Sequence, residues 1–371
     1  MQLLEEKKHP KGYIGLATTG KIHIGYFIPM IKVSDFLKAD FKFTILLADI
    51  HSHLDDQKAP FELLEHRVKY YKEIISAMIS ALGIDTKNLE FKRGSDFELD
   101  KNYTLDVYRL AALNTFDRCK RAAAGVVRFG ENPKLSGFIY PILQTLDEQY
   151  MNMDVQYGGI DQRKILAFAR ENLPKLGYRA RVEVMTPMLP GLQGAKMSAS
   201  EEKSKIDLLD SADIVKNKIN SAHCPIAVED NGVLAFLKYV IFAHKKDNNQ
   251  ELIIKRAEKF GGDTVYDSYE KLEKEYLNKK LHPMDIKNTV TEEVNNLLEP
   301  IRNKMKGKGD LIEEAFPVHK WNDQTSQGKI WKDIKLKKTF WNYKKFWATI
   351  EEKFLLGYLM VVIIVPQNAT S

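Results

Sequence analysis

The sequence predicts an α/β protein in which a parallel-sheet domain is followed by a mainly α-helical domain. Up to about residue 207, short apolar segments of strand type alternate with longer segments of helical spacing, which is typical of a parallel sheet covered by helices. Residues 212–305 carry helix-like segments and almost no strand signal. With 371 residues, 44% hydrophobic and 29% charged, the chain is long enough to build two apolar cores.

The elements of the first domain follow from apolar spacing and from glycine. Residues 43–48, FTILLA, form a continuous apolar run, the pattern of a buried parallel strand. After the Thr-Thr-Gly turn, apolar residues from Ile24 onward recur with helical spacing, and an amphipathic helix over 60–82 ends at Gly83. By the same criteria, the sequence predicts strands at 12–18, 89–92, 153–157 and 181–185, and helices at 103–124, 137–153 and 160–173.

Charge and cysteine content limit the class of protein. The formal net charge of +6 is compatible with a nucleic-acid partner without requiring one. Cys119 and Cys224 lack metal-ligand spacing, which argues against a disulfide framework and a structural zinc and favours a reducing compartment, the cytosol. The N-terminal residues show no signal-peptide pattern, and the apolar run at 354–365 is shorter than the roughly 20 residues of a membrane-spanning helix. No membrane association is therefore expected.

Three stretches compatible with phosphate binding lie at expected strand ends, where open α/β sheets bind ligands. In TTGKIHIGY, a helix N-terminus offers free N–H groups and His23 can donate to a phosphate. In YGGIDQRK, Asp161 can bridge ribose hydroxyls. In GAKMSAS, Lys196 stands in a loop of small, hydrogen-bonding residues. Each stretch also has a plainer interpretation, namely a capping histidine, an N-capping aspartate and a surface loop.

These stretches carry a family resemblance. HIGY at 23–26 resembles the HIGH signature of class I aminoacyl-tRNA synthetases, and KMSAS at 196–200 resembles their KMSKS loop, in the family's order and about 170 residues apart. The stretches LLADIHSHLDD, YTLDVYRL, YPILQTLDEQY, YGGIDQRK and KMSASEEKSKIDLLD resemble tyrosyl-tRNA synthetases of the archaeal and eukaryotic cytosolic type. The resemblance runs from about Tyr13 to Pro317.

The resemblance implies a division of the chain. Residues 1–207 would form a Rossmann-like catalytic domain, with a dimer-forming insertion at about 103–150 and a KMSKS-type loop at 194–203. Residues 208–317 would form a helical anticodon-binding domain. Residues 318–371 match nothing in the family, and they carry all four tryptophans among many lysines. That composition fits RNA contact, a membrane-surface or partner-binding segment, or an extension with no folded role.

The implied reaction is tyrosine–tRNA ligation driven by ATP, which enters with Mg²⁺ as a substrate complex. An amino-acid carboxylate is joined to the α-phosphate and pyrophosphate leaves, so positioning and charge stabilisation carry the catalysis. Tyr26 replaces the last histidine of HIGH and Ala199 the second lysine of KMSKS; both changes are familiar in the eukaryotic branch, so activity is expected. The matching catalytic and ATP-binding positions are Thr18, His23, Gly25, Gly159, Asp161, Lys196, Met197, Ser198 and Ser200.

Tyrosine would be recognised through its phenol hydroxyl, for which Tyr13 and Asp147 match the family's binding pair. Around the α-amino group, the matching residues are Tyr140, Gln144 and Gln162, and His51 would line the same pocket. Tyr140, Gln144 and Asp147 are spaced to share one face of a helix, where a buried amide and a buried carboxylate need partners. His51 and His53 also invite a metal interpretation, but no third ligand has metal-site spacing, and no metal site is predicted.

The tRNA would be bound at two places. An aromatic ring and an imidazole can sandwich an unstacked base, and a carboxylate can accept from guanine, the first base of tyrosine anticodons. Phe260, His282 and Asp285 match these roles, although Asp285 could instead be a helix cap beside a buried phenylalanine. Arg121 and Arg163 match positions that contact the first base pair of the acceptor end, although a solvated basic face is the alternative for Arg121.

Other interpretations stay open at this point. An RNA-binding relative without catalysis would be expected to have degraded ATP motifs, whereas this chain retains them. A tryptophanyl-tRNA synthetase shares the fold and the KMSAS loop, and the Tyr13 and Asp147 pair argues for a phenol over an indole. Tyrosine tRNA, L-tyrosine and ATP as partners, and a symmetric homodimer, are expected from the resemblance alone.

Overall fold

The computed structural model describes residues 2–194 and 205–317 of the protein. Its centre is a five-stranded sheet in the order β3-β2-β1-β4-β5, in which every pair is parallel. The strands are β1 (Lys11–Ala17), β2 (Lys42–Ala48), β3 (Leu89–Arg93), β4 (Val155–Gly159) and β5 (Val182–Thr186). The predicted α/β class with a parallel sheet is confirmed.

The strand order places a ligand crevice beside β1. The chain fills the sheet from β1 in both directions, with β2 and β3 on one side and β4 and β5 on the other. In parallel sheets the reversal of strand order opens a crevice at the carboxyl ends of the strands. Thr18 follows β1 at that edge, and Gly159 ends β4 there. Two of the predicted phosphate-binding stretches therefore meet at the switch point.

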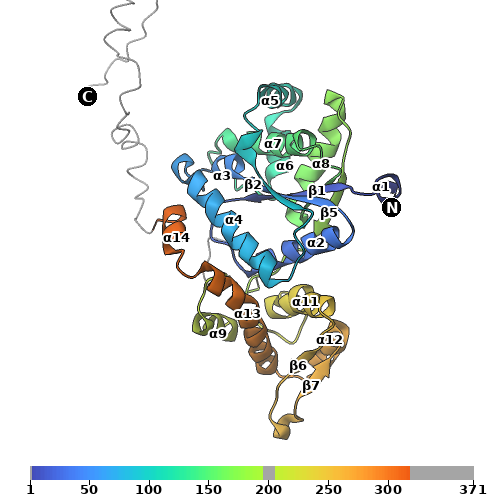
Figure 1. The fold of residues 1–371 in the computed structure, drawn as a ribbon, viewed down its shortest axis with the longest axis vertical. Coiled ribbons are helices and arrows are strands. Elements are labelled where there is room, and N and C mark those ends of the chain that lie inside the picture. Colours follow the sequence, from blue (N-terminus) through green and yellow to red (C-terminus); the bar gives the residue numbers. More distant parts are fainter. Residues whose placement is uncertain (1, 195–204, 318–371) are drawn as a thin grey trace, which may run out of the picture. The chain divides into compact units, whose positions relative to one another are not determined.

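Helices cover the sheet in two groups. The helices α2 (Phe27–Lys38) and α4 (Leu64–Ala81) pack on β2. Figure 1 shows a second group gathered together, made of α5 (Lys101–Leu113), α6 (Phe116–Ala123), α7 (Ser136–Tyr150) and α8 (Arg163–Asn172). Shorter elements complete this part: α1 (Gln2–Glu6), α3 (Asp49–Leu54), and the 3-10 turns η1 (Ile24–Tyr26), η3 (Gly94–Asp96) and η4 (Ile160–Gln162).

The later part of the chain is mainly helical. Its helices are α9 (Ala212–Asn220), α10 (Gly232–Phe236), α11 (Phe242–Asp247), α12 (Tyr269–Leu277), α13 (Pro283–Met305) and α14 (Gly309–Ala315). One apolar core runs from the sheet into these helices: Ile24, Phe27, Phe236 and Val290 belong to the same buried cluster. The proposed domain boundary at residue 207 stays a prediction.

Three sequence expectations differ from the structure. The single helix predicted over 103–124 is wrong, because Asn114 is extended and the Thr115 hydroxyl caps a new helix by accepting from the Arg118 N–H. The short helix α3 was not anticipated after β2. The antiparallel hairpin of β6 (Leu252–Ile254) and β7 (Thr264–Tyr266) was also missed, because three-residue strands are too short to show a periodic pattern.

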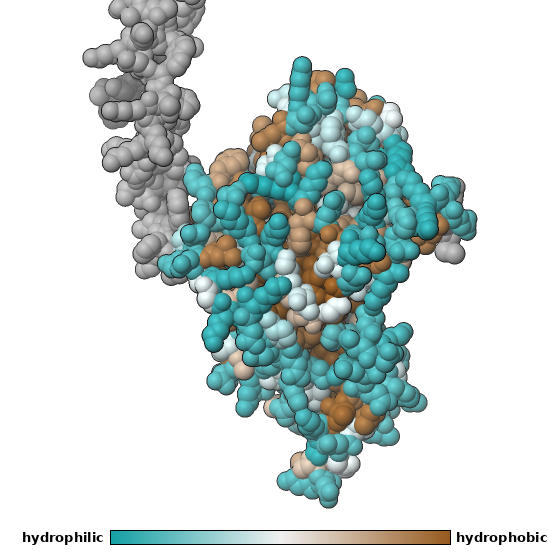
Figure 2. All heavy atoms as spheres, in the orientation of Figure 1, coloured by the Kyte–Doolittle hydropathy of each residue, from teal (hydrophilic) through white to brown (hydrophobic). Residues whose placement is uncertain are grey.

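The surface is mostly hydrophilic on the face shown in Figure 2, with scattered apolar groups. One apolar patch lies near the end that carries β6 and β7, where the cross-strand neighbours Ile253 and Val265 are both exposed. Within the described ranges, every helix is too short or too polar to cross a membrane.

Candidate active site

A cavity opens between the strand ends and α7. Its walls come from β1, β2, α3, α7, β4 and η4, so the fold gathers segments that are far apart in the sequence. All six residues predicted for tyrosine recognition line this one cavity: Tyr13, His51, Tyr140, Gln144, Asp147 and Gln162. Helix α7 supplies three of them at i, i+4 and i+7, as the spacing predicted.

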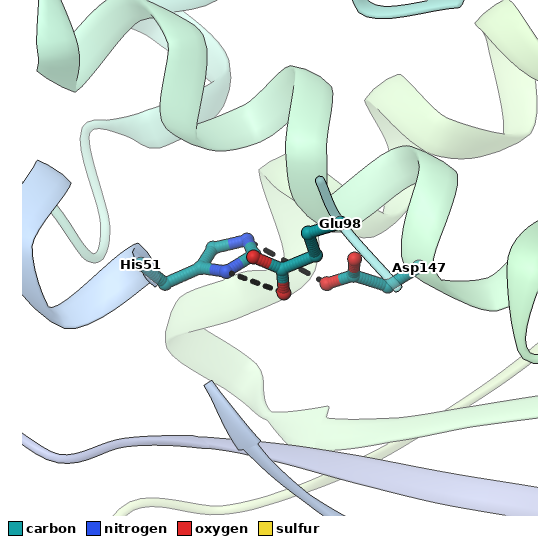
Figure 3. A group of neighbouring side chains, drawn as sticks. All are labelled: His51, Glu98 and Asp147. Carbon is teal, nitrogen blue, oxygen red and sulfur yellow. Dashed lines mark ion pairs between the residues drawn. The ribbon is translucent and has the colours of Figure 1, made fainter. Parts of the chain in front are cut away.

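Asp147 is held from two sides at the buried end of the cavity. The Tyr103 hydroxyl donates to Asp147 Oδ1 at 2.8 Å, and His51 Nε2 lies 3.6 Å from Asp147 Oδ2. The other ring nitrogen, His51 Nδ1, lies 3.5 Å from Glu98 Oε1 (Figure 3). These side chains are all buried, so their charges are poorly screened by water. The imidazole therefore bridges two carboxylates.

Burial and charge compete in this cluster. Burial opposes protonation of His51, but Glu98 and Asp147, with Asp49 behind them, outweigh it and raise the pKa of His51 to about 9. Burial, reinforced by the charge of Glu98, raises the pKa of Asp147 above its ordinary value, against the opposing effect of His51. A cationic His51 thus compensates negative charge that the pocket would otherwise carry uncompensated.

The same three side chains could in principle hold a metal ion, because their ligand atoms lie within 4.8 Å of one another. Each ring nitrogen of His51, however, faces a different carboxylate, and a metal would use only one of them. This geometry fits a charge bridge better than a metal site. That the protein binds no structural metal stays a prediction.

Replacing Glu98 with glutamine tests this bridge. We expect the pKa of His51 to fall by about one unit or more, because an opposite charge within a few ångströms is removed. The folded-state pKa lies above the ordinary 6.5, so protonation of His51 stabilises the fold fully below about pH 6.5, and this contribution is lost as the pH rises through 9. An NMR titration of the ring measures the shift. The exposed Asp96→Asn is the matched control, and an unchanged His51 titration in Glu98→Gln would contradict the bridge.

Several buried polar atoms around the cavity lack a partner among the described residues, including the Tyr13 hydroxyl and Gln156 Oε1. Burial raises the pKa of Tyr13, which keeps its hydroxyl neutral. A buried hydroxyl without a hydrogen bond destabilises the fold by about 1–3 kcal/mol. A ligand that brings its own hydroxyl to this end would remove that cost.

The opposite wall of the cavity carries a pair of amides. Gln144 Nε2 donates to Gln162 Oε1 at 2.8 Å, which joins α7 to η4. Gly158 lies directly behind, because a Cβ there would approach Gln162 Oε1 to 3.0 Å. The Tyr140 ring meets the His51 ring edge-on, with centroids 4.8 Å apart. The cavity therefore has a wall of amides and an end of carboxylates.

His23 begins η1, as the HIGY motif predicted. Its Nδ1 accepts from the Gly25 N–H at 3.1 Å, which leaves the ring proton on Nε2. Burial, with the nearby charge of Lys205, lowers the pKa of His23 to about 4, so the ring is neutral at physiological pH. A neutral imidazole with a free Nε2–H is a hydrogen-bond donor of the kind that a phosphate oxygen accepts.

The segment after the GAKMSAS loop returns beside His23. The Ile24 N–H donates to the Ile206 carbonyl at 2.9 Å, and the Leu208 N–H donates to the Ile22 carbonyl at 3.2 Å. Through these bonds the backbones of His23 and Asp207 form an isolated antiparallel β-bridge. The sequence did not indicate this pairing or the buried Lys205. Four predicted residues of the loop lie outside the described residues: Lys196, Met197, Ser198 and Ser200.

The remaining predicted ATP residues stand at the same edge of the sheet. Thr18 is buried and its hydroxyl donates to Ser52 Oγ at 3.0 Å, so it fixes the turn after β1 and its side chain offers no free donor. A Cβ at Gly159 would approach Asp161 Oδ1 to 2.5 Å and Met188 Sδ to 2.9 Å, so a larger residue there would displace the Asp161 side chain. Asp161 follows in η4 and is partly exposed.

The predicted anticodon residues lie in two turns of the helical part. Phe260 is 62% exposed and ends the turn η8 (Glu258–Phe260), directly before two glycines in the left-handed region. His282 and Asp285 form a reciprocal cap at the start of α13, in which Asp285 Oδ2 accepts from the His282 N–H at 3.1 Å. Asp285 thus makes the helix-capping contact of the alternative interpretation, but Phe260 is not buried as that interpretation expected. Arg121 and Arg163 are both exposed, on α6 and α8.

The chain is similar to known proteins over most of its length. Residues 5–299 match the model of the tRNA synthetases class I (W and Y). A cytoplasmic tyrosine–tRNA ligase of Gallus gallus is 52% identical over 320 residues, which is 85% of this chain and 60% of the relative. A tyrosine–tRNA ligase of Haloarcula marismortui is 44% identical and is covered to 92%. The chain spans about 60% of the length of the vertebrate relatives that it matches.

Solved structures agree in fold. The tyrosyl-tRNA synthetase of Archaeoglobus fulgidus complexed with L-tyrosine superposes with a TM-score of 0.76 at 39% identity, covering 82% of this chain and 92% of that one. The enzyme of Pyrococcus horikoshii, also complexed with L-tyrosine, gives 0.78 at 31% identity and covers 85% of this chain and 93% of that one. The fold of this chain is thus shared with two proteins whose structures contain L-tyrosine.

Proposed function

Because this chain belongs to the class I tRNA synthetases of the tryptophan and tyrosine group, we propose that it is a tyrosine–tRNA ligase. The observation that carries the proposal is the single cavity that contains Tyr13 and Asp147 together with the amide pair of Gln144 and Gln162. A phenol would reach Tyr13 and Asp147, and an α-amino group would reach the amides. An indole has no hydroxyl to place between Tyr13 and Asp147, which favours tyrosine over tryptophan.

In the first step, an oxygen of the tyrosine carboxylate attacks the α-phosphorus of ATP. The bond between the α-phosphorus and the oxygen that bridges to the β-phosphate breaks, and pyrophosphate leaves with the Mg²⁺ that entered with ATP as substrate. No proton transfer is needed, so the chain contributes position and charge. His23 donates from Nε2, Gly25 allows close approach, Gly159 and Asp161 hold the ribose side, and Lys196 with Ser198 and Ser200 neutralises the leaving group.

In the second step, a ribose hydroxyl at the end of tyrosine tRNA attacks the carbonyl carbon of the adenylate. The bond to the phosphate oxygen breaks, the hydroxyl proton passes to the released AMP or to solvent, and tyrosyl-tRNA forms. Transfer of labelled tyrosine to a tyrosine tRNA transcript tests the whole proposal. A folded protein that charges no tRNA would favour the RNA-binding relative without catalysis.

Asp285 is the proposed reader of the first anticodon base, beside Phe260 and His282. We expect Asp285→Asn to raise KM for tRNA about tenfold and to leave adenylate formation unchanged, because a donor replaces an acceptor opposite the guanine edge. Asparagine keeps an oxygen for the His282 N–H, so the cap of α13 survives. Aminoacylation kinetics measure the effect, with the exposed Asp267→Asn as control. A KM for tRNA within twofold of wild type would leave Asp285 as a cap only.

A homodimer is proposed through the α5 and α6 surface, inside the region 103–150. Tyr108 and Phe116 are 67% and 64% exposed there, with Leu105 and Leu113 nearby in sequence and also exposed. Exposed large apolar side chains on two consecutive helices are what supports an interface here. Light scattering that gives the mass of one chain would contradict the dimer. The cytoplasm is the proposed location, as the names of the vertebrate and yeast relatives state for those proteins, and fractionation of cells tests it.

A further inference from the structure

The turn between β1 and η1, residues 18–22, is bound by side chains of α4. The Tyr71 hydroxyl donates to the Gly20 carbonyl at 2.7 Å and accepts from the Gly20 N–H at 3.4 Å. The Tyr70 hydroxyl accepts from the Ile22 N–H at 3.3 Å. The turn forms no helix or strand of its own, so these side chains stand in for the missing secondary-structure bonds. Helix α4 thus fixes the backbone that leads directly into His23.

Arg67, one turn earlier on α4, is buried and holds backbone carbonyls from three segments. Its Nη1 donates to Thr18 at 3.2 Å, to Thr19 at 2.8 Å and to Lys58 at 3.0 Å, and its Nε donates to Ala315 at 3.2 Å. Within 2–194 and 205–317, no carboxylate pairs with it. Carbonyls carry only partial charge, and burial lowers the pKa of Arg67. A buried arginine with these partners serves to join segments.

The third segment is the end of α14. The Phe316 ring lies over the Arg67 guanidinium, 4.8 Å from Cζ to the ring centroid, and it meets the Tyr70 ring edge-on at 5.1 Å. An exposed side-chain contact also joins α14 to α4, in which His66 Nδ1 lies 3.1 Å from Glu314 Oε2. Arg67 therefore touches both the turn before HIGY and the last described helix, α14, which lies inside the predicted anticodon-binding domain of residues 208–317.

The HIGY motif itself joins this network. Its departure from HIGH is Tyr26, whose buried hydroxyl interacts electrostatically with that of Tyr71. Tyr71 therefore contacts the turn at Gly20 and the motif at Tyr26. A displacement of the α4 side chains would therefore move both ends of the predicted phosphate-binding segment.

We propose that Arg67 is a positioning residue through which α14 fixes the 18–22 turn for ATP. The inference rests on the proposed function, in which His23 and Gly25 bind ATP phosphates. Small displacements of groups that position a reacting centre reduce rates strongly. The packing of α14 would then determine the KM for ATP without any contact to the nucleotide. The tyrosine cavity would stay intact, because its walls include none of these residues.

Two substitutions and their combination test this. Arg67→Lys keeps the charge but lacks the fork that reaches Thr19 and Ala315 together, and Phe316→Ala removes the ring over the guanidinium. We expect each to raise KM for ATP in tyrosine-dependent pyrophosphate exchange, Arg67→Lys roughly tenfold. Because the Phe316 ring packs on the guanidinium that Arg67→Lys removes, the effects of the two changes should be less than additive in the double variant. The tyrosine Kd, measured by equilibrium dialysis without ATP, should stay within twofold.

The controls separate this inference from the proposed function. Lys72→Ala changes an exposed residue of the same helix, and His66→Ala removes only the exposed pair with α14; both should keep the KM for ATP. A KM for ATP unchanged in Arg67→Lys and Phe316→Ala, or a tyrosine Kd that rises in parallel, overturns the inference. If Arg67→Lys does not fold, Phe316→Ala alone decides. Absence of exchange in the wild-type protein would instead mean that the proposed function fails.

Discussion

Replacing Asp147 with asparagine is expected to lower kcat/KM for tyrosine by about a hundredfold. The carboxyl group is the acceptor at the buried end of the cavity, where the Tyr103 hydroxyl donates to Oδ1 and His51 Nε2 lies 3.6 Å from Oδ2. Pockets built to hydrogen-bond a hydroxyl reject the analogue that lacks it, and tyrosine-specific synthetases are the standard instance of this rule. The preference for tyrosine over phenylalanine should therefore fall along with activity.

Steady-state exchange with each amino acid measures both effects. Asp147→Asn should leave KM for ATP unchanged, since the cavity and the His23 segment are separate. Asp213→Asn, an exposed change on α9, is the control for the loss of one charge. An Asp147→Asn variant that keeps the wild-type ratio of tyrosine to phenylalanine would remove Asp147 from amino-acid selection.

Replacing His23 with alanine is expected to lower the rate of adenylate formation by about 10²–10³-fold. The ring supplies a neutral Nε2–H donor for phosphate, and its Nδ1 caps η1 by accepting from Gly25. Single-turnover formation of adenylate measures the loss. His23→Asn keeps a capping oxygen without a donor at the Nε2 position, so it should be nearly as slow as alanine. A rate near wild type in either variant, or a matching loss of tyrosine binding, would contradict the role of the ring.

The pKa of His23 gives a further check on the same residue. Because its folded-state value, about 4, lies below the ordinary 6.5, the neutral ring stabilises the fold above pH 6.5, and that contribution is lost as the pH falls toward 4. Between pH 6.5 and 8 the ring does not change charge. Titration of His23 should therefore contribute nothing to the pH dependence of adenylate formation in this range. The pH profiles of the wild type and of His23→Asn should have the same shape between pH 6.5 and 8.

One wall of the cavity was predictable because a single helix, α7, carries three of its eleven lining residues. Tyr140, Gln144 and Asp147 lie on one face of α7, and helical spacing reveals that face in the sequence. Glu98 was not predictable, because it lies in an ordinary polar stretch and its burial depends on packing between distant segments. Asp49 accepts from the N–H and hydroxyl of Ser95, which holds the turn η3 near α3. The only local signal is Gly94, where a Cβ would approach Glu98 Oε1 to 2.3 Å.

The fold was predictable where the elements are long. The buried run of β2 and the amphipathic spacing of α4 predict their structures directly. The break between α5 and α6 was not predictable, because the apolar spacing continues through it. Asn114 ends α5 there, and Thr115 caps the start of α6. The pairing of Ile24 with Ile206 also lies beyond local pattern, because it joins residues about 180 positions apart and forms only in the folded chain.

The measurement that tests the central claim most directly is exchange of labelled pyrophosphate into ATP, with tyrosine, phenylalanine and tryptophan compared side by side. The cavity predicts exchange with tyrosine alone, which would establish both the adenylation chemistry and the recognition of the phenol. Exchange with tryptophan instead would contradict the assignment of Tyr13 and Asp147. No exchange with any of the three, from protein shown to be folded, would contradict the enzyme and leave an RNA-binding relative of this family.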